Sequence, residues 1–302
     1  MQYRDLSGYL KETFGCKVYK LSLVGCVSCP NRDGTVGTGG CIFCSETGAG
    51  EFAEKQAATV SEQIEKAKIR VANKLKNAEK VKYIAYFQSF TNTYAPIYYL
   101  RDIFYSAIEN EEVAVLSIAT RPDCLSEEVI ELLNELNKIK PVWVELGLQT
   151  VHEKTAQFIR RGYSLDVYDD AVSRLHAVDV TVIAHMIIGL PGETEEMIFD
   201  TARHIGETAD GIKIHCLYVQ EGTDLAEIYR KGEITLPNME EYIRLLGGCI
   251  ERLPEKTVIH RMTGDGDKKT LIAPLWTANK RKVLNTIYAE FMRLDITQGR
   301  RH

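Results

Sequence analysis

Short β-branched or aromatic runs alternate with longer amphipathic stretches along most of this chain, and this alternation constrains the fold more than any other feature. The six runs cover residues 17–23, 82–87, 113–120, 141–149, 180–189 and 211–219. The helical patterns between them cover residues 60–75, 97–109, 126–138, 165–178 and 193–207. Several runs are almost continuously apolar, as is typical of parallel strands that are buried on both faces. The pattern therefore predicts βα units rather than a sandwich or a helix bundle.

A series of βα units can close into an eight-fold barrel, open into a doubly wound sheet or curl into a partial barrel. Six strands favour an α/β fold with a partial (β/α)6 TIM-type barrel over residues 1–219. Residues 220–302 follow without a Pro, Gly or Ser linker, and we expect them to form a C-terminal α/β extension packed on the barrel mouth. Functional groups are expected on the loops that leave the C-terminal ends of the strands.

Four cysteines follow the first predicted strand, in a loop that we place at residues 25–50. They are Cys26, Cys29, Cys41 and Cys44, and their spacing is C-x2-C-x11-C-x2-C. A structural zinc site would use all four thiolates, whereas a catalytic iron–sulfur cluster would use three and leave one iron open to a ligand. Phe43 and the glycines of the loop favour a cluster, because an aromatic ring excludes water and glycines let the backbone approach a bulky group. CxxC pairs are nevertheless common zinc ligands, so both interpretations stay open at this point.

Polar residues mark the ends of three further strands. Arg121 lies in "ATRPD", Glu145 and Gln149 lie in "VELGLQ", and "IIGLPGE" spans residues 187–193. The side chains of Glu145 and Gln149 share one face of their strand by period-two alternation. Buried polar groups need partners, so these residues either bond to one another or contact a polar ligand.

The ordered set of these motifs resembles the radical S-adenosylmethionine enzymes, and most closely their Elp3-like branch. Cys29, Cys41 and Cys44, the aromatic residue before the last cysteine, and "TRPD", "ELGLQ", "GLPGE" and "IKIH" at successive strand ends carry the resemblance. It covers about residues 17–223. Against a short bacterial group that resembles tRNA wobble-uridine-modifying proteins, it continues through "IHRMTGDG" and "LWTANKRKVLN" to the C-terminus.

The resemblance implies two cofactors and their ligands. Cys29, Cys41 and Cys44 would bind a [4Fe–4S] cluster, and S-adenosyl-L-methionine would be cleaved there to a 5′-deoxyadenosyl radical. Cys26 lies outside the family triad and is interpreted as a bystander thiol. The segment "QSFTN" (88–92) stands where many relatives carry a Gly-Gly-Glu, which puts the contact to the methionine amino group in doubt. The residues expected to contact the cofactors are Phe43, Gln88, Ser89, Asn92, Arg121, Glu145, Gln149, Ile187, Gly189 and Gly192.

The composition of the chain indicates which cellular compartment and which kinds of binding partner to expect. The N-terminus has no apolar signal segment and no apolar run is long enough to span a membrane, so we expect a cytoplasmic protein that needs no membrane. Eight cysteines, half of them in one window, fit a reducing compartment better than a disulfide framework. The formal net charge is −5, but residues 256–302 hold ten Lys or Arg against four Asp or Glu. Such a basic segment is either a solvated helix face or a contact for an anionic partner.

The resemblance makes tRNA the expected partner, with modification of the 5-carboxymethylaminomethyl or aminomethyl type on the side chain of its wobble uridine. Lys213, His215, Arg261 and Lys280 are the candidate substrate contacts, and a flavodoxin or ferredoxin type of protein would supply single electrons. Two rival interpretations remain. One is a radical enzyme that acts on a small metabolite or a tetrapyrrole, and the other is a zinc-stabilised RNA-binding adaptor without enzymatic activity.

Overall fold

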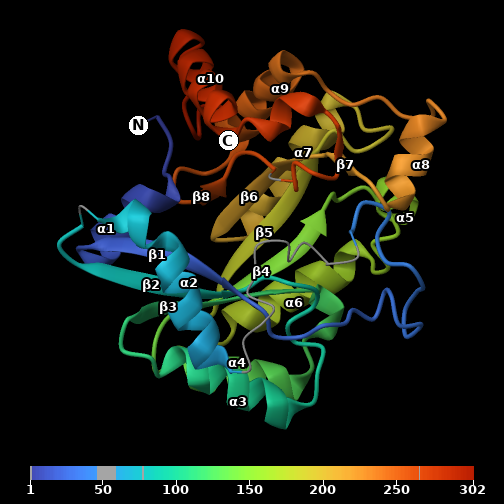
Figure 1. Ribbon diagram of the computed structural model, residues 1–302. Helices are drawn as coiled ribbons and strands as arrows, with labels where there is room; N and C mark the ends of the chain where they lie inside the picture. Colours follow the sequence, from blue (N-terminus) through green and yellow to red (C-terminus); the bar gives the residue numbers. More distant parts are fainter. Residues whose placement is uncertain (1, 46–58, 77, 265) are drawn as a thin grey trace.

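Seven parallel strands form one curled sheet in the computed structural model, which describes residues 2–45, 59–76, 78–264 and 266–302 (Figure 1). Along the sheet the order is β1-β2-β3-β4-β5-β6-β8. The bounds are β1 Lys17–Leu23, β2 Val81–Phe87, β3 Val113–Thr120, β4 Val142–Gln149, β5 Thr181–Ile188, β6 Gly211–Cys216 and β8 Val258–Arg261. The predicted partial barrel is confirmed, and all six predicted strands are present. Residues 46–50 of the predicted cluster loop lie outside the described residues.

Helices that follow the strands cover the outer face of the sheet. They are α2 Val60–Leu75, α3 Ile97–Ile108, α4 Glu127–Asn137, α6 Leu165–His176 and α7 Glu195–Thr208. Two short elements follow the ends of β3 and β4, the 3-10 helix Pro122–Cys124 and α5 Glu153–Phe158, and α5 lies near α8 Asp224–Arg230 (Figure 1). The side chains of Thr59, Ser126 and Thr194 accept hydrogen bonds from the first turns of α2, α4 and α7. All eight residues of β3 are buried, because helices cover one side of this strand and inward-facing side chains the other.

An N-terminal helix, α1 (Leu6–Phe14), closes one end of the inner face of the sheet. Leu10 packs there with Val18, Ile84 and Trp143, which lie in β1, β2 and β4. The sequence did not lead us to expect this helix, because its turns are mostly polar. Its packing leaves the opposite end of the inner face, at the C-terminal ends of the strands, for the functional groups.

The segment 220–302 contributes a strand to the main sheet. Its strand β8 extends the main sheet by pairing in parallel with β6, so the sheet has seven strands where the sequence pattern indicated six. A second, two-stranded sheet joins β7 (Val219–Gln220) to β9 (Leu271–Ala273). The remaining elements are α8 Asp224–Arg230, α9 Met239–Arg252, the 3-10 helix Leu275–Ala278 and α10 Lys280–Arg293.

The two ends of the chain lie side by side near β8 (Figure 1). The backbone N–H of Arg4 donates to the side chain of Gln298 at 2.8 Å, and Gln298 donates back to the carbonyl of Gln2 at 2.9 Å. None of the helices in the described part of the chain combines the length and the apolar character that crossing a membrane requires.

Candidate active site

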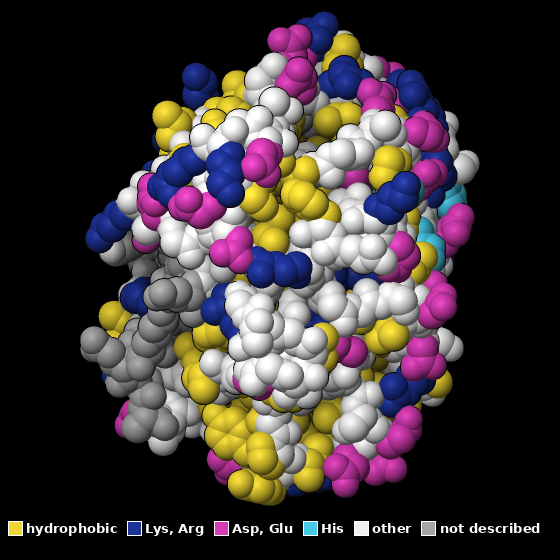
Figure 2. Space-filling model, turned by 90° about the vertical axis from the view of Figure 1, so that its right-hand side faces the viewer, with side chains coloured by type: hydrophobic (Ala, Val, Ile, Leu, Met, Phe, Trp, Pro, Cys, Tyr) yellow, Lys and Arg dark blue, Asp and Glu magenta, His cyan; other side chains and the backbone are white. Residues whose placement is uncertain are grey.

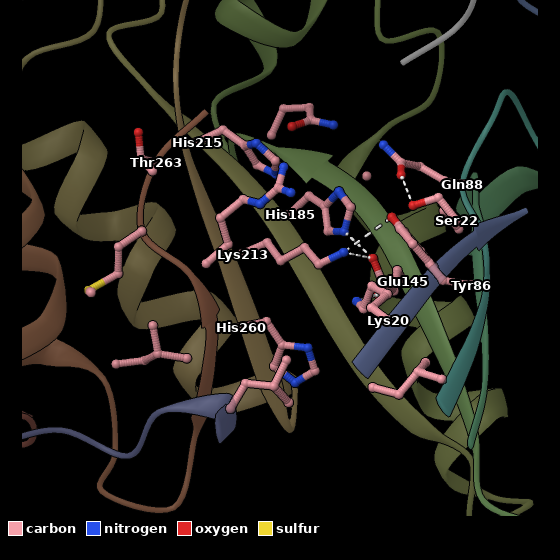
Figure 3. A pocket seen from close by; sticks show the side chains of 18 of the residues that line it. Lys20, Ser22, Tyr86, Gln88, Glu145, His185, Lys213, His215, His260 and Thr263 are labelled. Atoms are coloured by element: carbon pink, nitrogen blue, oxygen red, sulfur yellow. Dashed lines mark hydrogen bonds and ion pairs between the residues drawn. The ribbon is translucent and has the colours of Figure 1, made fainter. Parts of the chain in front are cut away.

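A cavity of about 750 Å³ lies on the inner face of the curled sheet (Figure 3). Alternate residues of the strands point into it, among them Lys20 and Ser22 of β1 and Glu145 and Gln149 of β4. The residues between them point outward; Leu21, for example, belongs to the core under the helices. The period-two alternation of a strand thus separates the cavity lining from the hydrophobic core.

Three of the four loop cysteines line this cavity. Cys29, Cys41 and Cys44 face it, whereas Cys26 is 4% exposed and packs within the main hydrophobic core. Burial raises the pKa of the Cys26 thiol to about 12. A four-thiolate zinc site would need Cys26 beside the other three, so this separation favours a ligand set of three thiolates.

The surroundings of the three thiols suit an iron–sulfur cluster. The thiol of Cys44 hydrogen-bonds Cys41 and lowers the pKa of Cys41 to about 7, and the charge of Arg121 adds to this effect. The side-chain amide of Asn31 donates to the sulfur of Cys41 at 3.5 Å. Within the described ranges, no three His, Cys, Asp or Glu residues are close enough to hold a single metal ion. A [4Fe–4S] cluster places each thiolate on a different iron, so it needs three thiols around one space rather than around one point.

Arg121 lies near the thiols and is held by its own hydrogen bonds, and Gln149 lines the same cavity. Arg121 is 8% exposed and donates two hydrogen bonds to Asp123, at 2.9 and 2.7 Å, and a third to the carbonyl of Arg161. Gln149 ends β4 in a left-handed conformation, with φ of 68°, which is uncommon for a residue other than glycine. Backbone of this kind persists where the surroundings impose it, and it often marks a ligand site.

A polar network is centred on Glu145, deeper in the cavity (Figure 3). One carboxylate oxygen accepts from Lys20 at 3.0 Å and from Ser117 at 2.8 Å, and the other bonds His185 at 2.9 Å and Lys213. Burial alone would raise the pKa of Glu145, but Lys20 and Lys213 lower it well below its ordinary value. Glu145 is therefore ionised and forms ion pairs with Lys20 and Lys213.

The basic groups of this network are strongly desolvated. Burial lowers the pKa of Lys213 well below its ordinary value, and nearby Lys20 and Arg261 lower it further. Burial also lowers the pKa of His185 to about 4, and those of His215 and His260 well below the ordinary value for histidine. In this site the three imidazoles are consequently neutral at pH 7.

Two imidazole nitrogens in the cavity are buried without a hydrogen-bond partner in the structure. They are Nε2 of His215 and Nδ1 of His260. The rings of His185 and His215 lie 5.4 Å apart, and that of His260 packs edge-on against Trp143 at 5.2 Å. Unpartnered buried polar atoms are rare in proteins and require an explanation such as a ligand.

The predicted site residues divide into two groups by position. Those that line the cavity are Cys29, Cys41, Phe43, Cys44, Gln88, Arg121, Glu145, Gln149, Lys213, His215, Arg261 and Lys280. The other five are not among its lining residues: Ser89, Asn92, Ile187, Gly189 and Gly192. Asn92 is 0% exposed and bonds the backbone of Cys26, Phe87 and Ala119, and Ile187 packs in a separate apolar cluster. Contact of these five with a cofactor stays a prediction.

Lys20, Tyr86, His185 and His260 also line the cavity, although the sequence analysis did not single them out. Lys20 and His185 are polar side chains in strands that are otherwise largely apolar. The same period-two reasoning that selected Glu145 would have selected both. His260 gave a weaker signal, because its strand is only four residues long.

Two models of known protein families match this chain, one over the barrel region and one over the C-terminal segment. The family model of the radical SAM superfamily covers residues 31–205, and that of the radical SAM C-terminal domain covers residues 209–293. The Bacillus subtilis protein YtqA is 42% identical over 99% of this chain and 92% of its own length. The tRNA uridine(34) acetyltransferase of Methanocaldococcus jannaschii is 30% identical, over 50% of this chain and 28% of its own length.

A solved structure supports the fold. The Elp3 protein of the archaeon Methanocaldococcus infernus superimposes with a TM-score of 0.66 at 17% identity, over 94% of this chain and 64% of that one. At this identity the likeness bears on the fold alone.

Proposed function

Because this chain belongs to the radical SAM superfamily, we propose that it is a radical enzyme that modifies the side chain of the wobble uridine in tRNA. The cofactors of the superfamily are a [4Fe–4S] cluster and S-adenosyl-L-methionine. When bound, they supply a carbon-centred radical that removes a hydrogen atom from the substrate. The modification would be of the 5-carboxymethylaminomethyl or aminomethyl type.

In this proposal Cys29, Cys41 and Cys44 hold the cluster. Phe43 lies beside Cys44 and keeps water from the thiolates, which favours a stable cluster. Gln88, Arg121 and Gln149 line the adjacent wall of the cavity and would contact S-adenosyl-L-methionine. The bidentate contact with Asp123 fixes the guanidinium of Arg121, so it would orient a bound group without first losing conformational freedom.

The charge of the cavity is the observation that carries the choice of an anionic substrate. Among the described lining residues, eight are Lys or Arg and two are carboxylates, although the whole chain has a net charge of −5. The eight are Lys17, Lys20, Arg32, Arg121, Arg161, Lys213, Arg261 and Lys280, and the two are Asp5 and Glu145. On the face shown in Figure 2, by contrast, acidic and basic side chains are interspersed. A basic cleft in an acidic protein concentrates anionic substrates.

The choice of tRNA rests on the similarity to the M. jannaschii tRNA uridine(34) acetyltransferase, which covers half of this chain. Lys280 begins α10 and lines the cavity, and Arg281 and Lys282 follow it on the exposed surface. We propose that this turn contacts tRNA phosphates while the uridine enters the cavity. A one-electron donor of the flavodoxin or ferredoxin type would reduce the cluster.

Nucleoside analysis tests the proposal. The cluster-loaded protein is incubated anaerobically with S-adenosyl-L-methionine, a chemical reductant and tRNA from a strain that lacks its gene, and the digested nucleosides are measured by mass spectrometry. We expect one wobble-uridine derivative to decrease and another to appear. Cys41→Ala should retain less iron and give no conversion, whereas Cys26→Ala should retain about four irons per chain and remain active.

Two results would contradict the proposal at different points. Cleavage of S-adenosyl-L-methionine with an unchanged nucleoside profile would leave the radical chemistry in place and remove tRNA as the substrate, in favour of a small metabolite. Equal loss of iron in Cys26→Ala and Cys41→Ala would return the loop to a four-thiolate site.

A further inference from the structure

The deep part of the cavity holds more positive charge than its own carboxylate balances. Lys20 and Lys213 both bond Glu145, which is the only carboxylate in contact with either lysine among the contacts of the described residues. The side chains of Lys213 and Glu145 are 6% and 0% exposed, so solvent screens this pair weakly. A buried charge is costly unless an opposite charge and hydrogen bonds compensate it.

The pairing of the strands places further basic side chains beside Lys213. The sheet register aligns His185 of β5 with Lys213 of β6, and Lys213 with Arg261 of β8. All three line the cavity. Lys213 and Arg261 are like charges on neighbouring strands, and such a pair by itself destabilises a sheet. A negative group bound beside Lys213 would offset this repulsion.

The hydrogen-bonding capacity that such a group needs is already present. His215 lies two residues after Lys213 on the same face of β6, and its Nε2 is buried without a partner in the structure. His260 also has an unpartnered Nδ1, but its ring lies against Gly211 and Trp143, at the other end of β6. In Figure 3 the side chains of Lys213 and His215 extend into one space, and that of His260 lies apart from His215. An imidazole N–H and an ammonium group together are good donors to an oxyanion.

We propose that Lys213 and His215 form a subsite for a compact oxyanion, and that this oxyanion is a carboxylate on the substrate. The assignment to a substrate rests on the proposed function, whereas the oxyanion chemistry does not. A single ammonium group beside an imidazole N–H suits a carboxylate at the end of a side chain. The carboxylate of S-adenosyl-L-methionine and an inorganic phosphate share the same chemistry and must be distinguished by experiment.

The first measurement uses simple anions and does not depend on RNA. The melting temperature of the cluster-loaded full chain is followed in sodium acetate, and separately in sodium phosphate, against sodium chloride of equal ionic strength. We expect acetate to raise the melting temperature of the wild type and of Lys140→Met, a control lysine outside the cavity. The increase should be absent in Lys213→Met and in His215→Phe, which preserves the aromatic shape. No increase in the wild type with either anion would overturn the subsite.

The second measurement identifies the source of the carboxylate. Two synthetic anticodon stem–loops carry at C5 of the wobble uridine either a carboxymethylaminomethyl group or its neutral methyl ester. Since a hydrogen bond to a charged group contributes about 1.5–3 kcal/mol, the wild type should bind the acid at least about tenfold more tightly than the ester. Lys213→Met and His215→Phe should bind both loops equally, with an unchanged affinity for S-adenosyl-L-methionine.

The possible outcomes separate the two proposals. Stabilisation by acetate without binding of either stem–loop would reject tRNA as the substrate and retain the oxyanion subsite. Weaker binding of S-adenosyl-L-methionine in both variants, with the preference for the acid intact, would assign the subsite to the cofactor and overturn its role toward the substrate. A preference for phosphate over acetate in the first measurement would replace the carboxylate by a phosphate group.

Discussion

Residues that are close together in this sequence differ in whether they line the cavity or belong to the hydrophobic core. Cys26 and Cys29 illustrate the division, because they belong to one CxxC pair but Cys26 enters the hydrophobic core while Cys29 lines the cavity. Their spacing in the sequence does not show which of the two cysteines lines the cavity. The sequence pattern shows which thiols are close along the chain, whereas their burial depends on how the loop packs on β1 and β2.

Asn92 makes backbone hydrogen bonds that its motif did not lead us to expect. It was expected at the cofactor, as part of the segment that replaces Gly-Gly-Glu. Its carbonyl oxygen accepts from the backbone of Cys26 at 3.2 Å, and its amide donates to the carbonyls of Phe87 and Ala119 at 3.1 and 2.9 Å. The side chain therefore joins the start of the cysteine loop to the ends of β2 and β3.

Substitution of Asn92 should cost stability. Asn92→Ala removes three hydrogen bonds and leaves buried backbone groups unpartnered, so we expect the free energy of unfolding to fall by about 2–4 kcal/mol. The measurement is the urea midpoint of the cluster-loaded protein. Asn285→Ala, at an exposed position on α10, is the control and should change it by less than about 0.5 kcal/mol. A loss of S-adenosyl-L-methionine binding without a loss of stability would instead favour the expected contact with the cofactor.

At the scale of whole elements, the sequence predicts long periodic segments well and short ones poorly. β1 and β3 coincide with the expected ranges, and α2 begins and ends where the pattern does. These segments carry many apolar residues at regular spacing, so the burial of one face determines their structure. β8 has four residues, and only its pairing with β6 distinguishes it from a loop. Membership of the main sheet is a long-range property that a local pattern does not contain.

Helix α9 offers a direct test of local stabilisation. Asn238 caps it: its side chain accepts from the backbone of Glu241 at 3.0 Å, and Glu241 accepts in return from the backbone of Asn238 at 2.8 Å. Asn238→Ala should lower the free energy of unfolding by about 1 kcal/mol, because the backbone N–H of Glu241 loses its side-chain acceptor.

The control for this prediction lies at the same position of another helix. Ser164 precedes α6, but its side chain makes no capping hydrogen bond. Ser164→Ala should therefore leave the urea midpoint nearly unchanged. Equal effects of the two substitutions would mean that helix propensity, and not the capping box, accounts for the change at Asn238.

At the scale of the whole molecule, one charged cavity sits inside a protein of net negative charge. The fold class and the three candidate cluster thiols could be predicted from patterns along the chain, whereas the polar network depends on the curvature of the sheet. Curvature brings Lys20 of β1 within 3.0 Å of Glu145 in β4, although β2 and β3 separate the two strands in the sheet. The spacing of residues in the sequence carries no information about this distance.

The buried histidines of the cavity should make global stability depend on pH. Burial lowers the pKa of His260 well below its ordinary value, and Lys20 and Lys213 oppose its protonation while Glu145 favours it. The unfolded chain therefore binds a proton below about pH 6.5 that the folded chain does not, so stability is retained above that pH and lost as the pH falls. Glu145 affects stability in a more acidic pH range. Its contribution to the free energy of unfolding is present above about pH 4.3 and is lost only at more acidic pH.

The contribution of His260 can be isolated by substitution. Between pH 7 and pH 5, a histidine that stays neutral in the folded state costs up to about 2 kcal/mol of unfolding free energy. His260→Phe removes this cost and keeps an aromatic ring against Trp143, so the urea midpoint should fall less steeply with acidification than in the wild type. His302→Phe, at the exposed C-terminus, is the control and should keep the wild-type slope. An unchanged slope in His260→Phe would mean that the folded cavity accepts a proton at this position.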